Sequence, residues 1–132
     1  MRQISLGLLD MAYHSKDPSA IADLRKFEEE VMEKTDLLPK VPGTMASTSF
    51  SHIFQGGYSS GYYSYKWAEV LDADAFELFL ERGVFDQRTA ISFETNILSA
   101  GGTEHPAILY KRFRGRDPKA DALLKRSGLI SA

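Results

Sequence analysis

Apolar residues recur along this chain at three- and four-residue intervals, a spacing typical of amphipathic helices. Near the N-terminus, Ile4, Leu8 and Met11 fall on one side of a predicted helix. A second helix is expected to begin at Asp17-Pro18, with the aspartate as N-cap and the proline in the first turn, and to end near Thr35. No alternating run rich in β-branched residues appears, so no strand is predicted.

The rest of the chain continues the helical pattern after an irregular stretch. Residues 36–49 contain prolines, a glycine and several Thr and Ser residues, and predict a crossing without regular structure. The first helix expected after it covers residues 59–71, and a second, recapped at Asp72 or Asp74, ends at Gly83. A third covers residues 87–99, and a fourth is opened by His105-Pro106 and extends through Phe113. The last covers residues 120–127, after a second Asp-Pro start at Asp117-Pro118. The prediction is an all-α chain of six or seven helices, forming a single segment over residues 1–132 without an internal repeat.

Composition narrows the classes of function. The chain has 132 residues, of which 43% are hydrophobic and 26% charged, and a net charge of −2, so neither nucleic acid nor a membrane is an expected partner. It has no cysteine, which excludes disulfides and thiolate chemistry. It also lacks the run of roughly 18 apolar residues that a membrane span requires. We expect a cytoplasmic protein, with the periplasm as the alternative.

The densest chemistry lies in residues 50–67, which hold one of the three histidines, four of the six tyrosines and the single tryptophan. If the chain is helical from Ser59 onward, Tyr58, Tyr62 and Tyr65 are spaced i, i+4 and i+7, and their hydroxyls align along one face. Such phenols stay protonated at neutral pH and can donate hydrogen bonds to an oxyanion. The alternative is an amphipathic helix whose tyrosines lie at its boundary with solvent.

Three further residues of this segment can serve a ligand. Gly56 and Gly57 precede the tyrosines and can adopt positive φ, so a ligand can approach the backbone closely. His52 can hold a carbonyl or a carboxylate, depending on its protonation. The histidines form no His-Glu-x-x-His motif, and no nucleophile elbow or phosphate loop occurs. The chain therefore carries part of an active site rather than a complete one.

The string from His52 to Trp67 resembles the substrate-binding segment of the thimet oligopeptidase family of zinc metallopeptidases, and most of all its bacterial peptidyl-dipeptidase Dcp branch. Residues 98–104 and 110–129 resemble the C-terminal end of that family, so the resemblance covers nearly the whole chain. It implies part of the catalytic lobe of a longer, mostly helical, two-lobed enzyme. It also implies a zinc ion held by a His-Glu-x-x-His helix and a downstream glutamate. None of these ligands is present in this sequence, so we assign it no metal ligand and expect His14 and His105 to be surface or helix-end residues.

The resemblance also implies roles for the residues of this segment. Tyr65 matches the tyrosine that donates to the tetrahedral oxyanion, and Tyr58 matches a second tyrosine needed for turnover. Tyr62 matches a tyrosine beside the substrate backbone. His52 matches a histidine that contacts the substrate near the scissile bond. Gly56-Gly57 matches a flexible loop that closes over the peptide.

We therefore expect a C-terminal, substrate-binding and oxyanion-stabilising segment of a zinc-dependent oligopeptidase that releases C-terminal dipeptides from short peptides. Its expected partners are a peptide substrate and the remainder of the peptidase chain. The first helix lacks a capping residue, which suggests that it is cut in its middle. Alone, the segment is expected to bind no zinc, to be inactive, and to self-associate through apolar faces of its first and fifth helices. The alternative is a non-catalytic helical module that binds peptides or a partner chain; a His-Glu-x-x-His motif upstream of Met1 would favour the enzyme, and a natural start at Met1 would favour the module.

Overall fold

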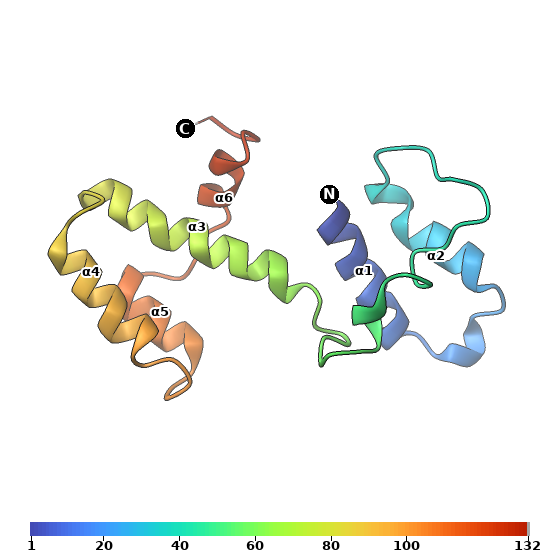
Figure 1. Ribbon diagram of the computed structural model, residues 1–132, viewed down its shortest axis with the longest axis horizontal. Coiled ribbons are helices and arrows are strands. Elements are labelled where there is room, and N and C mark those ends of the chain that lie inside the picture. The colour runs from blue at the N-terminus through green and yellow to red at the C-terminus, as the bar shows by residue number, and fades with distance from the viewer. Residues whose placement is uncertain (132) are drawn as a thin grey trace. The chain divides into compact units, whose positions relative to one another are not determined.

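The computed structural model describes residues 1–131, and its regular structure over that range is entirely helical (Figure 1). The predictions of an all-α chain and of six or seven helices are confirmed. The α-helices are α1 (Arg2–Ser15), α2 (Leu24–Met32), α3 (Ser64–Arg82), α4 (Gln87–Phe93), α5 (Pro106–Arg114) and α6 (Asp121–Arg126). None of the helices within this range combines the length and the apolar character that a membrane span needs.

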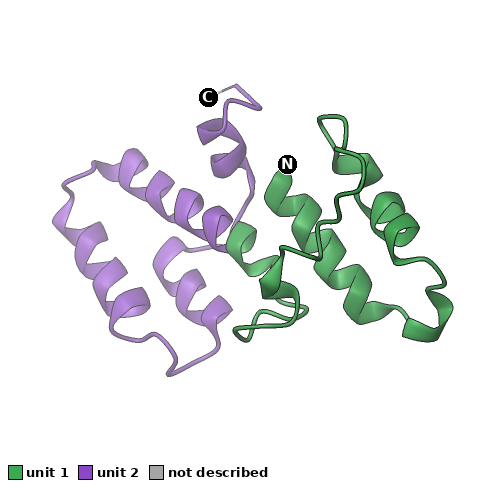
Figure 2. Ribbon diagram, turned by 45° about the vertical axis from the view of Figure 1, so that its right-hand side comes forward, with its two compact units in different colours: residues 1–67 green, residues 68–132 purple. Residues whose placement is uncertain are grey.

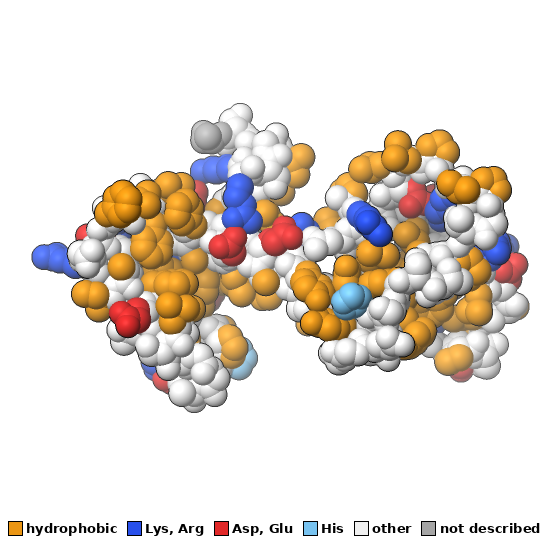
Figure 3. Space-filling model, viewed as in Figure 1, with side chains coloured by type: hydrophobic (Ala, Val, Ile, Leu, Met, Phe, Trp, Pro, Cys, Tyr) orange, Lys and Arg blue, Asp and Glu red, His pale blue; other side chains and the backbone are white. Residues whose placement is uncertain are grey.

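The chain folds into two compact units (Figure 2). Unit 1 covers Met1–Trp67 and unit 2 begins at Ala68. Hydrophobic side chains reach the surface of both units (Figure 3).

In unit 1, α1 packs against α2 over a small core. Leu9 and Ile53 are fully buried in this core and Phe50 nearly so. The apolar residues Ile4, Leu8 and Met11 remain 41–46% exposed, because the buried side of α1 is the one that carries Leu9. The helix therefore carries two apolar faces, of which this unit covers one.

The second helix begins later than predicted. Asp17 does act as an N-cap, but only of a three-residue 3-10 turn, η1 (Pro18–Ala20), after which the chain becomes extended at Ile21. Asp23 is the N-cap of α2, since its Oδ1 accepts hydrogen bonds from the backbone N–H groups two and three residues later. The helical path then ends with the 3-10 turn η2 (Glu33–Thr35), as predicted, and residues 36–49 contain no regular helix, also as predicted.

In unit 2, α3 continues without a break past the two aspartates that were expected to recap it. Asp74 cannot cap a helix, because its buried carboxylate is bound by the side chains of Arg116 and Tyr110. The predicted stop is confirmed: Gly83 follows the last residue of α3 with φ of +108°, a conformation that other residues rarely adopt.

Two of the remaining helices of unit 2 begin where predicted, and the last one lacks its predicted Asp-Pro cap. α4 continues into a π-helical segment, η4 (Glu94–Leu98), which packs against α5. His105 is the N-cap of α5, and Gly115, with φ of +80°, is its C-cap. The N-cap of α6 is Ala120, so the second Asp-Pro pair precedes that helix without capping it.

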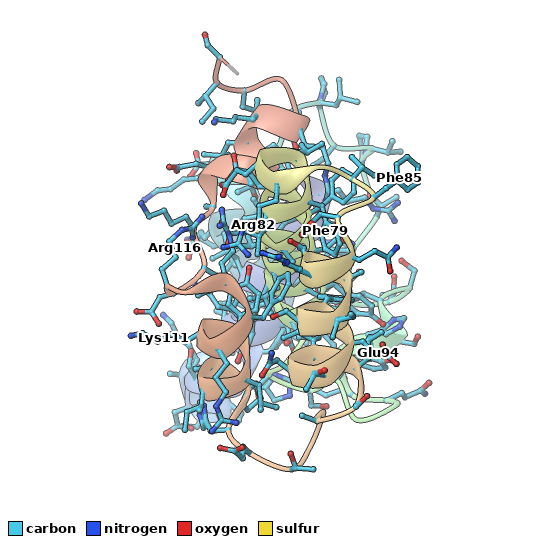
Figure 4. The ribbon with its side chains drawn as sticks, turned by 90° about the vertical axis from the view of Figure 1, so that its left-hand side faces the viewer. Phe79, Arg82, Phe85, Glu94, Lys111 and Arg116 are labelled. Atoms are coloured by element: carbon cyan, nitrogen blue, oxygen red, sulfur yellow. The ribbon has the colours of Figure 1, made fainter. Side chains whose placement is uncertain are left out.

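Four of the eight apolar residues in the core of unit 2 are aromatic, among them Phe79, which is labelled in Figure 4. Phe79 of α3 packs against Phe93 of α4 and Phe113 of α5, with ring centroids 6.0 and 6.3 Å apart. The buried members of this core are Ala75, Leu78, Tyr110 and Phe113. Phe85, in the turn after α3, points away from it and is 92% exposed.

Candidate active site

The four side chains that carry the predicted chemistry come from three kinds of local structure within unit 1. His52 lies in the 3-10 turn η3 (Ser51–Ile53), Tyr58 and Tyr62 lie in the turns that follow, and Tyr65 lies in the first turn of α3. The prediction of a helix from Ser59 was wrong, because α3 begins only at Ser64. Ser60, with φ of +54°, interrupts any helical path before that point.

The four rings nevertheless meet in one cluster. The His52 ring centroid lies 5.0, 5.6 and 6.3 Å from those of Tyr58, Tyr62 and Tyr65. Tyr58 and Tyr65 stack with centroids 5.4 Å apart and planes 18° from parallel, and Tyr62 lies 5.1 Å from Tyr65. The tyrosines thus form a stacked pair with a third ring beside it, instead of a row along one helix.

This His-Tyr cluster, formed by His52, Tyr58, Tyr62 and Tyr65, rests on the core of unit 1. Tyr62 meets the buried Phe50 edge-on, with ring centroids 4.6 Å apart. His52, Tyr58 and Tyr62 are half-buried, and Tyr65 is 36% exposed. One side of the cluster is therefore held by packing while the other is open to a ligand.

Interaction with the Tyr58 phenol, desolvation and the charges of Tyr58 and Tyr62 raise the pKa of Tyr65 above its ordinary value of 10.0. A raised pKa keeps the phenol protonated. Tyr65 is consequently a hydrogen-bond donor at neutral pH.

The paired glycines before the cluster both take the left-handed conformation. Gly56 and Gly57 have φ of +72° and +76°. A Cβ built on Gly56 would lie 3.1 and 3.2 Å from ring atoms of Tyr58, whereas one built on Gly57 would meet no atom within 4 Å. Glycine is thus required at both positions by the backbone, and at Gly56 also by the space beside Tyr58.

One buried carboxylate that the sequence analysis did not single out supports this segment. Asp10 of α1 is fully buried, and its two oxygens accept hydrogen bonds from the backbone N–H groups of Ser60 and Tyr62, at 2.9 and 3.0 Å. In the sequence, Asp10 lies four residues after Leu6 and three residues before Tyr13, and both of these residues pack against the core. A carboxylate on the core-facing side of a helix needs partners.

The other two histidines lie at helix ends, as predicted. His14 is in the last turn of α1, and its Nδ1 lies 2.8 Å from the backbone oxygen of Asp10. His105 accepts a hydrogen bond from the N–H of Ala107 at the start of α5.

Comparison with known proteins now places the chain in a family. Residues 1–129 match peptidase family M3. The chain belongs to this family. Within it, the chain is 45% identical over 130 residues to oligopeptidase A of Escherichia coli (strain K12), a match that covers 98% of this chain and 19% of that protein.

Two further M3 relatives show the range of names in the family. Identity is 40% over 137 residues to the probable cytosolic oligopeptidase A of Arabidopsis thaliana, covering 100% of this chain and 20% of that protein. It is 36% over 128 residues to the dipeptidyl carboxypeptidase of Escherichia coli (strain K12), covering 96% and 19%. The chain thus spans about a fifth of the length of the relatives it matches. These identities do not favour the expected peptidyl-dipeptidase branch over oligopeptidase A.

The side chains described here do not fit the zinc ion that this family implies. Residues 1–131 contain no group of three or more His, Cys, Asp or Glu side chains that could hold a metal ion. His14 is engaged by Asp10, His52 by aromatic rings, and His105 by the start of α5. We therefore derive no step through a metal from these residues.

Proposed function

We propose that this chain supplies the substrate-binding and oxyanion-stabilising wall of an M3 oligopeptidase that cleaves short peptides. The observation that carries the proposal is the His-Tyr cluster, in which two stacked phenols lie beside a third phenol and an imidazole on a partly exposed face of unit 1. Membership of peptidase family M3 and the names of the relatives support the same reaction class.

The proposed chemistry uses the donors of the cluster. When a nucleophile adds to a peptide carbonyl, negative charge develops on the oxygen, and fixed hydrogen-bond donors lower the barrier. We assign this role to Tyr65, assisted by Tyr58, since Tyr65 is the most exposed of the three phenols and a phenol stays protonated at neutral pH. His52 and Tyr62 would then contact the substrate backbone on either side of the reacting carbonyl.

The glycine pair gives the substrate access to the main chain. Because Gly57 has no neighbouring atom within 4 Å of where a Cβ would stand, a peptide can approach its backbone directly. We propose that Gly56 and Gly57 contact the bound peptide, with Gly56 also setting the position of the Tyr58 ring.

The zinc ion and the base that the reaction requires would come from parts of the protein outside these residues. Large apolar side chains exposed on both units support docking against such parts: the most exposed include Leu38 at 81%, Leu37 at 74% and Phe85 at 92% (Figure 3). The exposed stripe of α1 at Ile4, Leu8 and Met11 is a further candidate surface. Without a covering partner, such surfaces promote self-association.

The substrate length and the mode of cleavage belong to the same proposal. We propose short peptides as substrates, cleaved in the cytosol, the compartment given in the name of the Arabidopsis relative. Mass spectrometry of the products of one defined decapeptide distinguishes internal cleavage from release of C-terminal dipeptides. The relatives include proteins named oligopeptidase A and dipeptidyl carboxypeptidase, and this measurement decides between the two modes.

Tyr65→Phe in the full-length protein tests the assignment. It removes one hydroxyl and keeps the ring that stacks on Tyr58, so kcat is expected to fall by about a hundredfold or more while KM changes little. Tyr63→Phe is the matched control, because Tyr63 is 58% exposed and its ring makes no contact with the cluster. Both are measured with a fluorogenic peptide. An unchanged kcat in Tyr65→Phe would remove Tyr65 from the reaction.

A further inference from the structure

Asp10 bonds to the middle of the segment that carries the His-Tyr cluster, although 50 residues separate it from Ser60. Its Oδ1 accepts from the N–H of Ser60 at 2.9 Å and its Oδ2 from the N–H of Tyr62 at 3.0 Å. Its side chain is 0% exposed, so water does not compete for either oxygen. One carboxylate thus fixes two backbone positions on either side of Gly61.

His14 completes the set of donors around this carboxylate. Its Nδ1 lies 2.8 Å from the backbone oxygen of Asp10 and 3.1 Å from Oδ1 of the same residue. Both neighbours are acceptors, so Nδ1 carries the hydrogen. The His14 ring therefore holds Asp10 in the orientation that receives the two N–H groups.

The segment that Asp10 holds has a conformation that needs such support. Ser60 is the one non-glycine residue with positive φ among the described residues, and this conformation is unfavourable for a residue with a Cβ. Backbone hydrogen bonds between residues three apart lie on both sides of it: the N–H of Gly61 donates to the oxygen of Tyr58 at 2.7 Å, and the N–H of Tyr65 donates to the oxygen of Tyr62 at 3.3 Å. Fixing Ser60 and Tyr62 therefore fixes the backbone of the tyrosines on both sides.

We propose that Asp10 is a positioning residue for catalysis, which holds the backbone of Tyr58 to Tyr65 so that the phenols point at the reacting carbonyl. The inference rests on the proposed function of the cluster. Asp10 touches no substrate in this role and acts only through the backbone it binds. Because displacement of a reacting group by about 1 Å can cost about a hundredfold in rate, a loosened turn should lower kcat strongly.

Glu28 provides a matched control in the same unit. It is a second buried carboxylate, 3% exposed, and it too accepts from two backbone N–H groups, those of Ala46 at 2.8 Å and Ser47 at 3.2 Å. It holds a different loop, which carries none of the cluster. Glu28 also accepts from the Tyr13 hydroxyl at 3.0 Å, but none of its partners belongs to the His-Tyr cluster, so its loss should cost stability without moving Tyr58, Tyr62 or Tyr65.

The test compares Asp10→Asn, Glu28→Gln and Tyr65→Phe in the full-length protein. Each amide keeps the shape of the side chain but replaces one accepting oxygen with an NH2 group that cannot accept. With a fluorogenic peptide, at a temperature where thermal scans show all variants folded, Asp10→Asn is expected to lower kcat by about tenfold or more with a smaller change in KM. Glu28→Gln is expected to lower Tm but to keep kcat within about twofold of the parent protein.

The outcomes separate this inference from the proposed function. If Tyr65→Phe is impaired while Asp10→Asn matches Glu28→Gln in kcat, the role of Asp10 is overturned and the function of the cluster stands. If Tyr65→Phe keeps full activity, both are overturned. Should Asp10→Asn fail to fold, His14→Ala decides, because it removes the imidazole donor to Asp10 and leaves both backbone N–H partners of the carboxylate in place: a smaller fall in kcat supports the role, and an unchanged kcat overturns it.

Discussion

Replacement of Asp74 by alanine is expected to destabilise unit 2 strongly. This α3 residue is fully buried. Its Oδ1 lies 2.6 Å from Nη2 of Arg116, and its Oδ2 lies 3.1 Å from Nη1 of Arg116 and 2.7 Å from the Tyr110 hydroxyl. Burial alone would raise the pKa of Asp74, but the hydrogen bonds from Arg116 and Tyr110 and the charges of Arg116 and Arg114 outweigh it and lower the pKa. The carboxylate is therefore charged at neutral pH.

The loss of stability in Asp74→Ala depends on which hydrogen-bond acceptors Arg116 and Tyr110 retain. Removing one partner of a buried ion pair typically costs about 3–5 kcal/mol. Arg116 retains the backbone oxygen of Asp117 at 2.9 Å, and Tyr110 retains that of Leu71 at 3.3 Å, so the lower end of this range applies. For a domain the size of unit 2, each kcal/mol of lost unfolding free energy lowers Tm by about 4 °C or more. A loss of about 3 kcal/mol therefore lowers Tm by at least about 12 °C.

Asp72, which lies two residues before Asp74 in the same helix, is the control. Its Oδ2 lies 2.7 Å from Nη1 of Arg126, a separation close to that of Asp74 and Arg116, but the two side chains are 66% and 48% exposed. Such pairs contribute about 0–1 kcal/mol. Differential scanning calorimetry of Asp72→Ala and Asp74→Ala compares them directly. Equal falls in Tm would refute the argument that burial, rather than distance, sets the contribution.

Two further predictions concern the glycine pair and the buried phenol. Gly57→Ala is expected to lower the free energy of unfolding by about 1–2 kcal/mol, because of its left-handed φ alone. Gly56→Ala should in addition displace the Tyr58 ring and change the near-ultraviolet circular dichroism. Gly57→Ala should leave that spectrum unchanged. Burial and the hydrogen bond to Asp74 raise the pKa of Tyr110, so its stabilising contribution is complete below the unfolded value of 10.0 and is lost as pH rises through the folded value. Tm measured from about pH 9 upward should therefore fall less steeply in Tyr110→Phe, and identical slopes would contradict this.

Much of the fold follows from local signals in the sequence. The stop at Gly83 and the start at His105-Pro106 act where they were expected, because each depends on backbone geometry within a few residues. The start of α2 was misplaced because Asp17 and Asp23 both carry a capping side chain, and only the extended backbone at Ile21 decides between them.

The candidate site was found from the sequence for a partly wrong reason. The density of tyrosines around His52 identified the segment, but the helical spacing from Ser59 does not exist. The rings meet because the chain turns sharply before α3 and because Asp10 bonds the turn from α1. No local pattern around Ser60 specifies that contact.

The sequence by itself determined the helical class, most helix ends and the segment that holds the phenols, since helical spacing, caps and glycines act over a few neighbouring residues. Only the tertiary structure decided that Leu9, and not Leu8, faces the core of unit 1, and that Asp10 and Asp74 are buried with their partners. Which face is covered depends on packing between residues about 40 to 50 positions apart. Helical periodicity marks an apolar face without identifying what will cover it.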